Sequence, residues 1–121
     1  MIVLADTSVW IDHWRRGNPR LQKLLEADQI VVHPFVLGEI ALGAITPRAE
    51  VLTHLGALRA PRVAQHDEVM ALIDRARLWT RGIGWVDVHL LASALLDQIR
   101  VWTLDQALAG AAHTLGVAAG F

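Results

Sequence analysis

Short apolar runs alternate with amphipathic stretches along the whole chain. The first run, residues 2–5, is uninterrupted, a second short run lies at residues 30–32, and residues 99–103 also read as a short strand. Runs of this kind are typical of strands that are buried on both faces, as in a parallel sheet. The pattern therefore predicts three short strands, with residues 2–5 in a central position.

Helical periodicity fills the segments between these strands. It is clearest over residues 67–80, where apolar residues recur every three or four positions and Gly82 and Gly84 follow as an end signal. Residues 59–66 fit neither pattern. The other expected helices are residues 7–16, a stretch around residues 21–25, residues 34–45, a helix from Pro47, one around residues 88–95, and residues 105–115. Strands that alternate with helices predict an α/β/α sandwich with a short parallel sheet.

The length and composition favour one folded unit. A chain of 121 residues allows one domain and no second module. Hydrophobic residues make up 54% and charged residues 19%, a balance too apolar for a disordered chain. Asp6 interrupts the first apolar run, and the apolar stretch at residues 90–96 is too short for a membrane span. We therefore expect a single domain over residues 1–121 that is cytoplasmic, without a membrane segment.

Four carboxylates stand apart from the other acidic residues, because each is the only charged residue in a long apolar stretch. They are Asp6 within residues 2–11, Glu39 within residues 34–45, Asp87 within residues 82–96, and Asp105 within residues 101–116. An ionised carboxylate in apolar surroundings is costly unless it is paired or binds a metal, and no basic residue is nearby in sequence. These four side chains are therefore the candidates for a functional site.

The expected fold brings the four acids together. Asp6 and Asp105 follow parallel strands, so they lie at the same edge of the sheet, where ligands collect in such folds. Asp87 lies at a helix start, and Glu39 lies about one and a half turns into the helix after the second strand. Four carboxylates there would repel one another unless a hard cation such as Mg²⁺ or Mn²⁺ were bound. The alternative is that the three aspartates only cap helices, a role for which Glu39 lies too far from its helix start.

These segments resemble the PIN-domain ribonucleases, and specifically the VapC-type toxins of type II toxin–antitoxin pairs, over the whole length of the chain. The resemblance rests on IVLADTS at residues 2–8, on Glu39, on DVHLLASA at residues 87–94, and on WTLD at residues 102–105. In that family the acidic positions hold Mg²⁺ or Mn²⁺, and a hydroxyl at the position of Ser8 supports them. The family often carries a further acid and an aromatic residue where this chain has Ala107 and Leu108, which leaves open whether one or two metal ions act.

The resemblance implies an endoribonuclease that cleaves RNA through a metal-activated water and leaves a 5′-phosphate. Asp6 and Asp87 would be the principal ligands, Glu39 a ligand or the group that orients the water, and Asp105 a supporting ligand. It also implies a cognate small antitoxin whose C-terminal tail enters the cleft. The alternative is a catalytically silent PIN-like module that binds RNA or protein, although such a module would be expected to have lost some of the four acids.

Two further groups of residues are candidates for contacts with partners. The net charge of −1 predicts no general attraction to nucleic acid, but a local basic patch would bind the RNA backbone. The best local cluster is Arg15, Arg16, Arg20 and Lys23, which would equally suit a solvated helix face. Trp10 and Trp14, on one helix face, are interface candidates, and the high hydrophobic content of so small a chain suggests a homodimer.

Several other classes of site are excluded or disfavoured. The chain has no cysteine, which excludes a disulfide scaffold and a cysteine nucleophile. Its six histidines are too far apart in sequence for a local zinc motif. A phospho-accepting receiver domain would need a lysine after a late strand, and the only lysine is Lys23.

Overall fold

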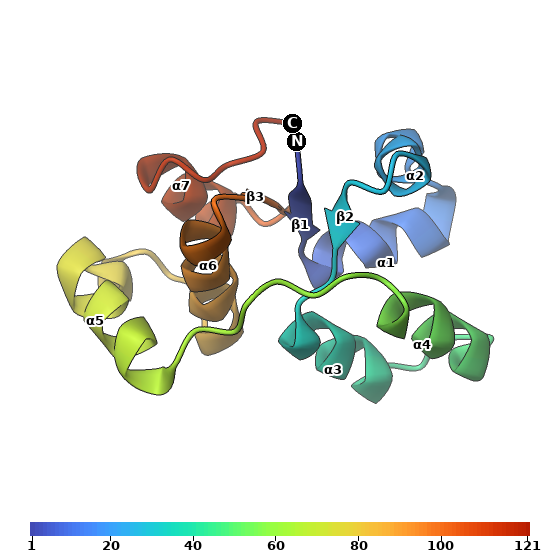
Figure 1. The fold of residues 1–121 in the computed structure, drawn as a ribbon, viewed down its shortest axis with the longest axis horizontal. Coiled ribbons are helices and arrows are strands. Elements are labelled where there is room, and N and C mark those ends of the chain that lie inside the picture. Colours follow the sequence, from blue (N-terminus) through green and yellow to red (C-terminus); the bar gives the residue numbers. More distant parts are fainter.

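A three-stranded parallel sheet lies at the centre of the molecule (Figure 1). The computed structural model describes residues 1–121. The strands are β1 (Val3–Ala5), β2 (Ile30–Val31) and β3 (Arg100–Trp102), in the spatial order β2-β1-β3. Val3 of β1 pairs with Ile30 on one side and with Arg100 on the other. The three predicted strands are confirmed, with the first in the centre.

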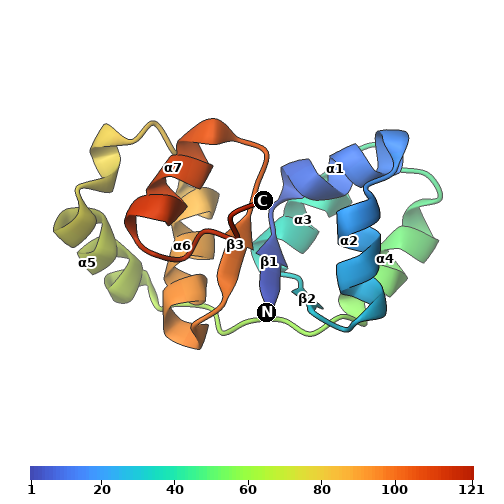
Figure 2. The ribbon, with the colours of Figure 1, turned by 90° about the horizontal axis from the view of Figure 1, so that it is seen from above.

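Seven α-helices and one short 3₁₀ helix flank this sheet. They are α1 (Thr7–Arg16), α2 (Pro19–Glu26), α3 (Pro34–Leu42), α4 (Arg48–Gly56), α5 (His66–Ala76), η1 (Leu78–Thr80), α6 (Trp85–Asp97) and α7 (Gln106–Thr114). Helices α1 to α4 gather on the β2 side of the sheet and α5 to α7 on the β3 side, as two perpendicular views show (Figures 1 and 2). The expected α/β/α sandwich is confirmed.

One predicted helix is too long. The helix expected over residues 67–80 ends at Ala76, because Arg77 adopts a left-handed backbone conformation with φ 54° and ψ 45°. This break redirects the chain into η1, whose Leu78 is buried in the core. Gly82 and Gly84 therefore precede α6 rather than ending α5. The helix expected to run to Ile45 is also shorter, since α3 ends at Leu42.

Of residues 59–66, which fit no pattern, His66 begins α5, and residues 59–65 cross the molecule as irregular backbone between α4 and α5 (Figure 2). Arg62 fastens this segment to the end of α6. Its Nε donates to Asp97 Oδ1 at 2.6 Å, and its backbone N–H donates to Asp97 Oδ2 at 2.8 Å. These bonds hold the pKa of Asp97 below its usual value. A side-chain anchor of this kind leaves no periodic trace in the sequence.

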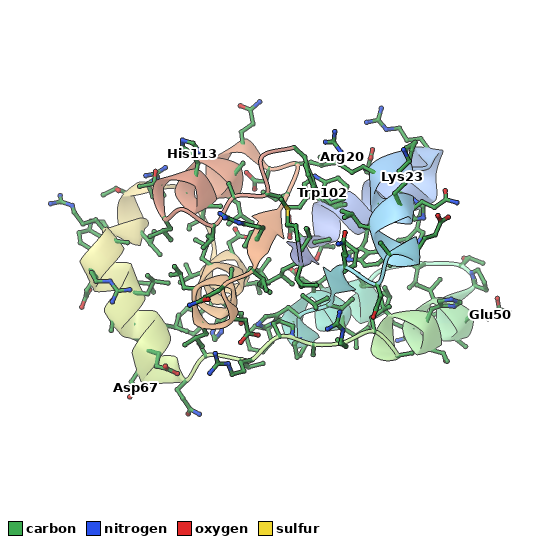
Figure 3. The ribbon with its side chains drawn as sticks, turned by 45° about the horizontal axis from the view of Figure 1, so that its top comes forward. Arg20, Lys23, Glu50, Asp67, Trp102 and His113 are labelled. Carbon is green, nitrogen blue, oxygen red and sulfur yellow. The ribbon has the colours of Figure 1, made fainter.

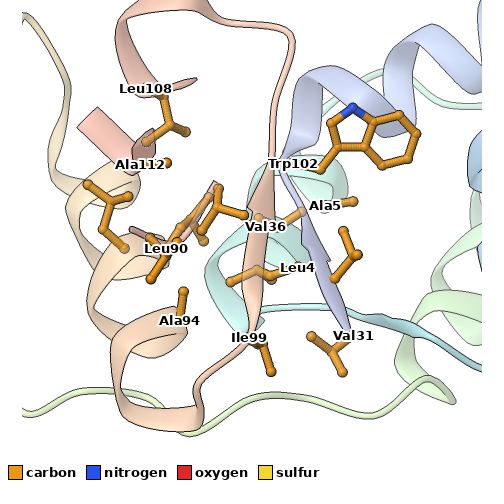
Figure 4. Packing of buried hydrophobic residues seen from close by; sticks show 14 of the residues in the cluster. Leu4, Ala5, Val31, Val36, Leu90, Ala94, Ile99, Trp102, Leu108 and Ala112 are labelled. Atoms are coloured by element: carbon orange, nitrogen blue, oxygen red, sulfur yellow. The ribbon is translucent and has the colours of Figure 1, made fainter. Parts of the chain in front are cut away.

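A single hydrophobic cluster of 28 buried side chains joins the two groups of helices through the sheet. Leu4 from β1, Val36 from α3, Leu90 from α6 and Leu108 from α7 all contribute to it (Figure 4). Trp10 belongs to the same cluster with 3% exposure, so its prediction as an interface residue is wrong. The apolar face of α1 that carries Trp10 is turned to the core. None of the helices combines the length and the hydrophobicity that a membrane span requires.

Two histidines are buried among the helices beside the sheet. His33 is fully buried and caps α3, with its Nδ1 accepting a hydrogen bond from the Phe35 N–H at 2.9 Å. Its Nε2 and the Nδ1 of His89 have no hydrogen-bond partner. Burial lowers the pKa of His33 to about 4, with a further contribution from the charge of His89, and burial also lowers the pKa of His89. Both side chains are neutral at pH 7.

We expect His33 to make the protein less stable in mild acid. In the unfolded chain this histidine takes up a proton near pH 6.5, whereas in the folded protein it does so only near pH 4, so stability is lost as the pH falls between these values. Between pH 7.5 and pH 5 the free energy of unfolding, measured with urea, should fall by about 1 kcal/mol less in His33→Asn than in wild type, after allowance for solvent screening. His113→Asn, at an exposed histidine, is the control. Equal losses in wild type and His33→Asn would contradict the prediction.

Candidate functional site

Asp6 follows the central strand directly and begins the first helix. Its backbone N–H donates to the Trp102 carbonyl at 2.8 Å, which extends the pairing of β1 and β3 by one residue. Its side chain caps α1, because Oδ1 accepts the Thr7 N–H at 2.7 Å. The residue is only 8% exposed. Strand pairing and helix capping together hold this carboxylate at the edge of the sheet.

Two hydroxyl groups hold the other carboxylate oxygen of Asp6. Ser8 Oγ and Thr103 Oγ1 donate to Asp6 Oδ2 at 2.9 and 2.8 Å. The same hydroxyls accept the backbone N–H groups of Leu104 and Asp105, each at 3.0 Å. Because an ionised carboxylate oxygen only accepts, the hydroxyls are the donors in their bonds to Asp6. The orientation of this carboxylate is therefore fixed by one hydroxyl from α1 and one that follows β3.

Asp105 and Asp87 lie at the starts of the last two α-helices. Asp105 is the N-cap of α7, and its Oδ1 accepts the Ala107 N–H at 2.9 Å. Asp87 lies in the first turn of α6, and its Oδ2 accepts the Gly84 N–H at 3.0 Å. All three aspartates therefore make the capping bonds that their positions in the sequence allow. Capping alone leaves the gathering of three carboxylates at one place unexplained.

The three aspartates interact through their charges. Burial raises the pKa of Asp87, and the charges of Asp6 and Asp105 raise it further, against the opposite effect of the Gly84 N–H. The three ion pairs of the structure involve other carboxylates, those of Asp12, Asp28 and Asp97. Negative charge therefore collects at this edge without a cationic side chain to neutralise it.

Glu39 reaches the same edge from α3. Thr7 Oγ1 donates to Glu39 Oε1 at 2.8 Å, and Thr7 is the residue that follows Asp6. Glu39 and Asp105 are both exposed, so the prediction that all four acids lie in apolar surroundings is wrong for these two. Val36 and Ile40, the apolar neighbours of Glu39 in sequence, face the core from the other side of α3.

The chemistry of the donor set suits a hard divalent cation. The four acids offer only carboxylate oxygens, which Mg²⁺ and Mn²⁺ prefer, and Ser8 and Thr103 orient the most buried of them. No three acidic or histidine side chains surround one point closely enough to hold an ion as they stand. The carboxylates thus gather at the edge without forming a closed coordination shell.

Thr7 and Thr103 were not predicted as site residues. Thr103 follows β3 and precedes Asp105 by two positions, just as Ser8 follows Asp6 by two positions. A hydroxyl at this spacing beside an acid at a strand end could have identified Thr103 from the sequence. Thr7 could not be identified in this way, because its bond to Glu39 spans 32 positions.

Comparison with known proteins finds similarity over nearly the whole chain. The model of the PIN domain family matches residues 3–113, a range that includes all four acids. The chain is 48% identical over 118 residues to "Ribonuclease VapC32" of Mycobacterium tuberculosis (strain CDC 1551 / Oshkosh), and the match covers 97% of this chain and 95% of that protein. The same values hold for "Ribonuclease VapC32" of strain ATCC 25618 / H37Rv.

Proposed function

The chain belongs to the PIN-domain family, and from this premise we propose that it is an endoribonuclease of the VapC toxin type, with residues 1–121 forming a single nuclease domain. The observation that carries the proposal is the collection of Asp6, Asp87 and Asp105, with Glu39 beside them, at the edge of the sheet. The relatives with 48% identity, which bear the name ribonuclease, support the same activity.

Each of the acids has a distinct role in this proposal. Asp6 and Asp87 are the principal ligands of Mg²⁺ or Mn²⁺, Asp105 is a supporting ligand, and Glu39 is a ligand or orients the attacking water. When bound, the cation supplies positive charge that activates water and offsets the charge developing on the phosphodiester. Ser8 keeps Oδ2 of Asp6 in place.

The hydrogen bond from Thr7 supports the second of the two roles proposed for Glu39, the orientation of water, because it engages only one carboxylate oxygen. Oε1 accepts the Thr7 hydroxyl at 2.8 Å, so it is fixed toward α1. Oε2 has no such bond and is the free acceptor for a proton of the attacking water. Attack at phosphorus then breaks the bond to the 3′-oxygen, which takes up a proton. The upstream fragment ends in a 3′-hydroxyl, and the downstream fragment carries the 5′-phosphate.

The test is a cleavage assay with purified protein and a structured RNA. We expect discrete cuts in Mg²⁺ or Mn²⁺ and none in EDTA. Intact RNA under all of these conditions would favour the alternative function, a catalytically silent PIN-like module that binds RNA or protein.

We also propose that the chain forms a homodimer and pairs with a small antitoxin protein. Its surface exposes several large apolar side chains, among them Trp14, Leu42, Trp79 and Trp85, which are unfavourable in contact with water. Light scattering should report a mass of about twice 13.3 kDa. A strictly monomeric species at micromolar concentration would contradict the dimer.

A further inference from the structure

A groove of about 700 Å³ runs between the α1–α2 turn, the end of β3 and the last residues of the chain. We call it the basic groove, because three of the side chains that line it are cationic. These are Arg16, Arg20 and Lys23, against a single carboxylate, that of Asp12. Arg15, the other member of the cluster seen in the sequence, does not line the groove.

The cations of the basic groove are largely free to bind an anion. Arg16 donates from Nε to Asp12 Oδ1 at 2.6 Å, and this bond holds the pKa of Asp12 below its usual value. Arg20 and Lys23 form no ion pair, and both are exposed. The groove therefore presents net positive charge to solvent.

Arg20 is also part of a stacked surface. Its guanidinium carbon lies 4.4 Å from the centre of the Phe121 ring, and Phe121 packs edge-to-face on Trp102 with ring centres 5.1 Å apart. Arg20 and Lys23 lie near Trp102 on this side of the molecule (Figure 3). A guanidinium stacked on one face keeps its other face and its N–H edge available to a base or a phosphate.

The basic groove and the carboxylate edge share structural elements. Leu104 lines the groove, and its backbone N–H donates to Ser8 Oγ, which donates to Asp6 Oδ2. Trp102, also in the lining, accepts the Asp6 N–H through its carbonyl. A polymer that reaches Asp6 with one segment can thus lie in the groove with the next.

We propose that the basic groove binds the single-stranded RNA that flanks the scissile phosphodiester, with Arg20 and Lys23 contacting its phosphates. This inference rests on the proposed function, because it concerns the substrate of the same site. The carboxylate edge repels phosphates, so the positive charge that attracts a nucleic acid has to come from beside it. Charge alone would also suit an acidic polypeptide, but charge together with a flat stacking surface favours unstacked nucleotides.

The experiment compares two double variants that remove the same charge. Arg20→Ala/Lys23→Ala changes the groove, whereas Arg48→Ala/Arg75→Ala removes two exposed arginines that lie outside it and form no ion pair. Cleavage of a single-stranded RNA is measured at several salt concentrations. For the groove variant we expect KM to rise roughly 10-fold or more with little change in kcat. The slope of log(kcat/KM) against log[salt] should become less steep by about 1.4, which is about 0.7 for each lost phosphate contact. The control pair should stay close to wild type.

Four further measurements make the outcome decisive. Circular dichroism confirms folding, and Lys23→Ala alone, which disturbs no stacking, should show about half the change in salt dependence. Fluorescence polarisation with labelled RNA in EDTA reports binding without cleavage, so it tests the groove even if the wild type does not cut RNA. Equal behaviour of the two double variants would overturn the inference. Unchanged RNA affinity with weaker binding of poly-glutamate would assign the groove to an acidic protein segment instead.

Discussion

Replacing Asp6 with asparagine is expected to abolish metal-dependent RNA cleavage, with a loss on the order of 10³-fold or more in kcat. Asparagine has nearly the same shape, and its amide oxygen can still accept the Thr7 N–H that caps α1. The substitution therefore removes the negative charge while leaving the start of the helix in place. Initial cleavage rates in Mg²⁺, measured with a labelled RNA, check this expectation.

A second acidic residue serves as the control for Asp6. Asp74 is exposed on α5 and takes part in no ion pair, so Asp74→Asn changes the net charge by the same amount at a place remote from the sheet edge. We expect its activity to match wild type, and both variants to melt cooperatively. An Asp6→Asn protein that cuts RNA as fast as Asp74→Asn would show that Asp6 is not a ligand.

The central strand was predictable because it is buried on both faces. Val3, Leu4 and Ala5 have no exposed surface, so every position of β1 must be apolar, and the sequence shows an uninterrupted run. Asp6 ends that run at the point where the sheet meets solvent. The same reasoning places Asp105 beyond β3, and the structure brings the charges of both close enough to raise the pKa of Asp87.

Features set by side-chain contacts between distant segments were not predictable. The end of α5 depends on the left-handed conformation of Arg77, although arginine is a good helix former. Trp10 and Trp14 share a helix face in sequence, yet Trp10 is buried and Trp14 is 38% exposed, because the core covers only part of that face. Likewise, only the folded chain separates Arg15 from the cations of the basic groove.

From the sequence, capping and metal binding are alternative roles for the aspartates, but the geometry makes them compatible. A residue between a strand and the helix after it points its side chain at the helix start, which is also the edge where ligands collect. Asp6 and Asp105 each accept one helix N–H through a single oxygen. The second oxygen of each carboxylate is left for other partners, and in Asp6 two hydroxyls already orient it.

Asp87→Asn should raise the melting temperature of the metal-free protein by roughly 2–5 °C. Burial and the charges of Asp6 and Asp105 make the ionised form of Asp87 unfavourable, and asparagine removes that charge while its amide oxygen can still accept the Gly84 N–H. Mg²⁺ should raise the melting temperature of wild type by mass action, and less so that of the variant, which has lost a ligand. Melting curves with and without Mg²⁺ measure both effects.

The control variants for Asp87 separate charge from capping. Asp74→Asn should leave both the metal-free melting temperature and the Mg²⁺ response unchanged. Asp87→Ala removes the capping bond as well as the charge, so it should melt below Asp87→Asn. If Asp87→Asn melts lower than wild type without metal and keeps the full Mg²⁺ shift, Asp87 is a structural cap and not a ligand.

The pH dependence of the stability difference between wild type and Asp87→Asn, both without metal, tests whether that difference is electrostatic. The pKa of Asp87 is raised in the folded protein above its ordinary value of 3.8, so wild type gains stability as the pH falls from the raised value toward 3.8. The advantage of Asp87→Asn should therefore shrink over that range, because protonated Asp87 is also uncharged. The destabilisation in acid that His33 causes is the same in wild type and in Asp87→Asn, so it cancels when their free energies of unfolding are subtracted. An advantage that stays constant from pH 7 to pH 4 would mean that packing, not charge, distinguishes the two side chains.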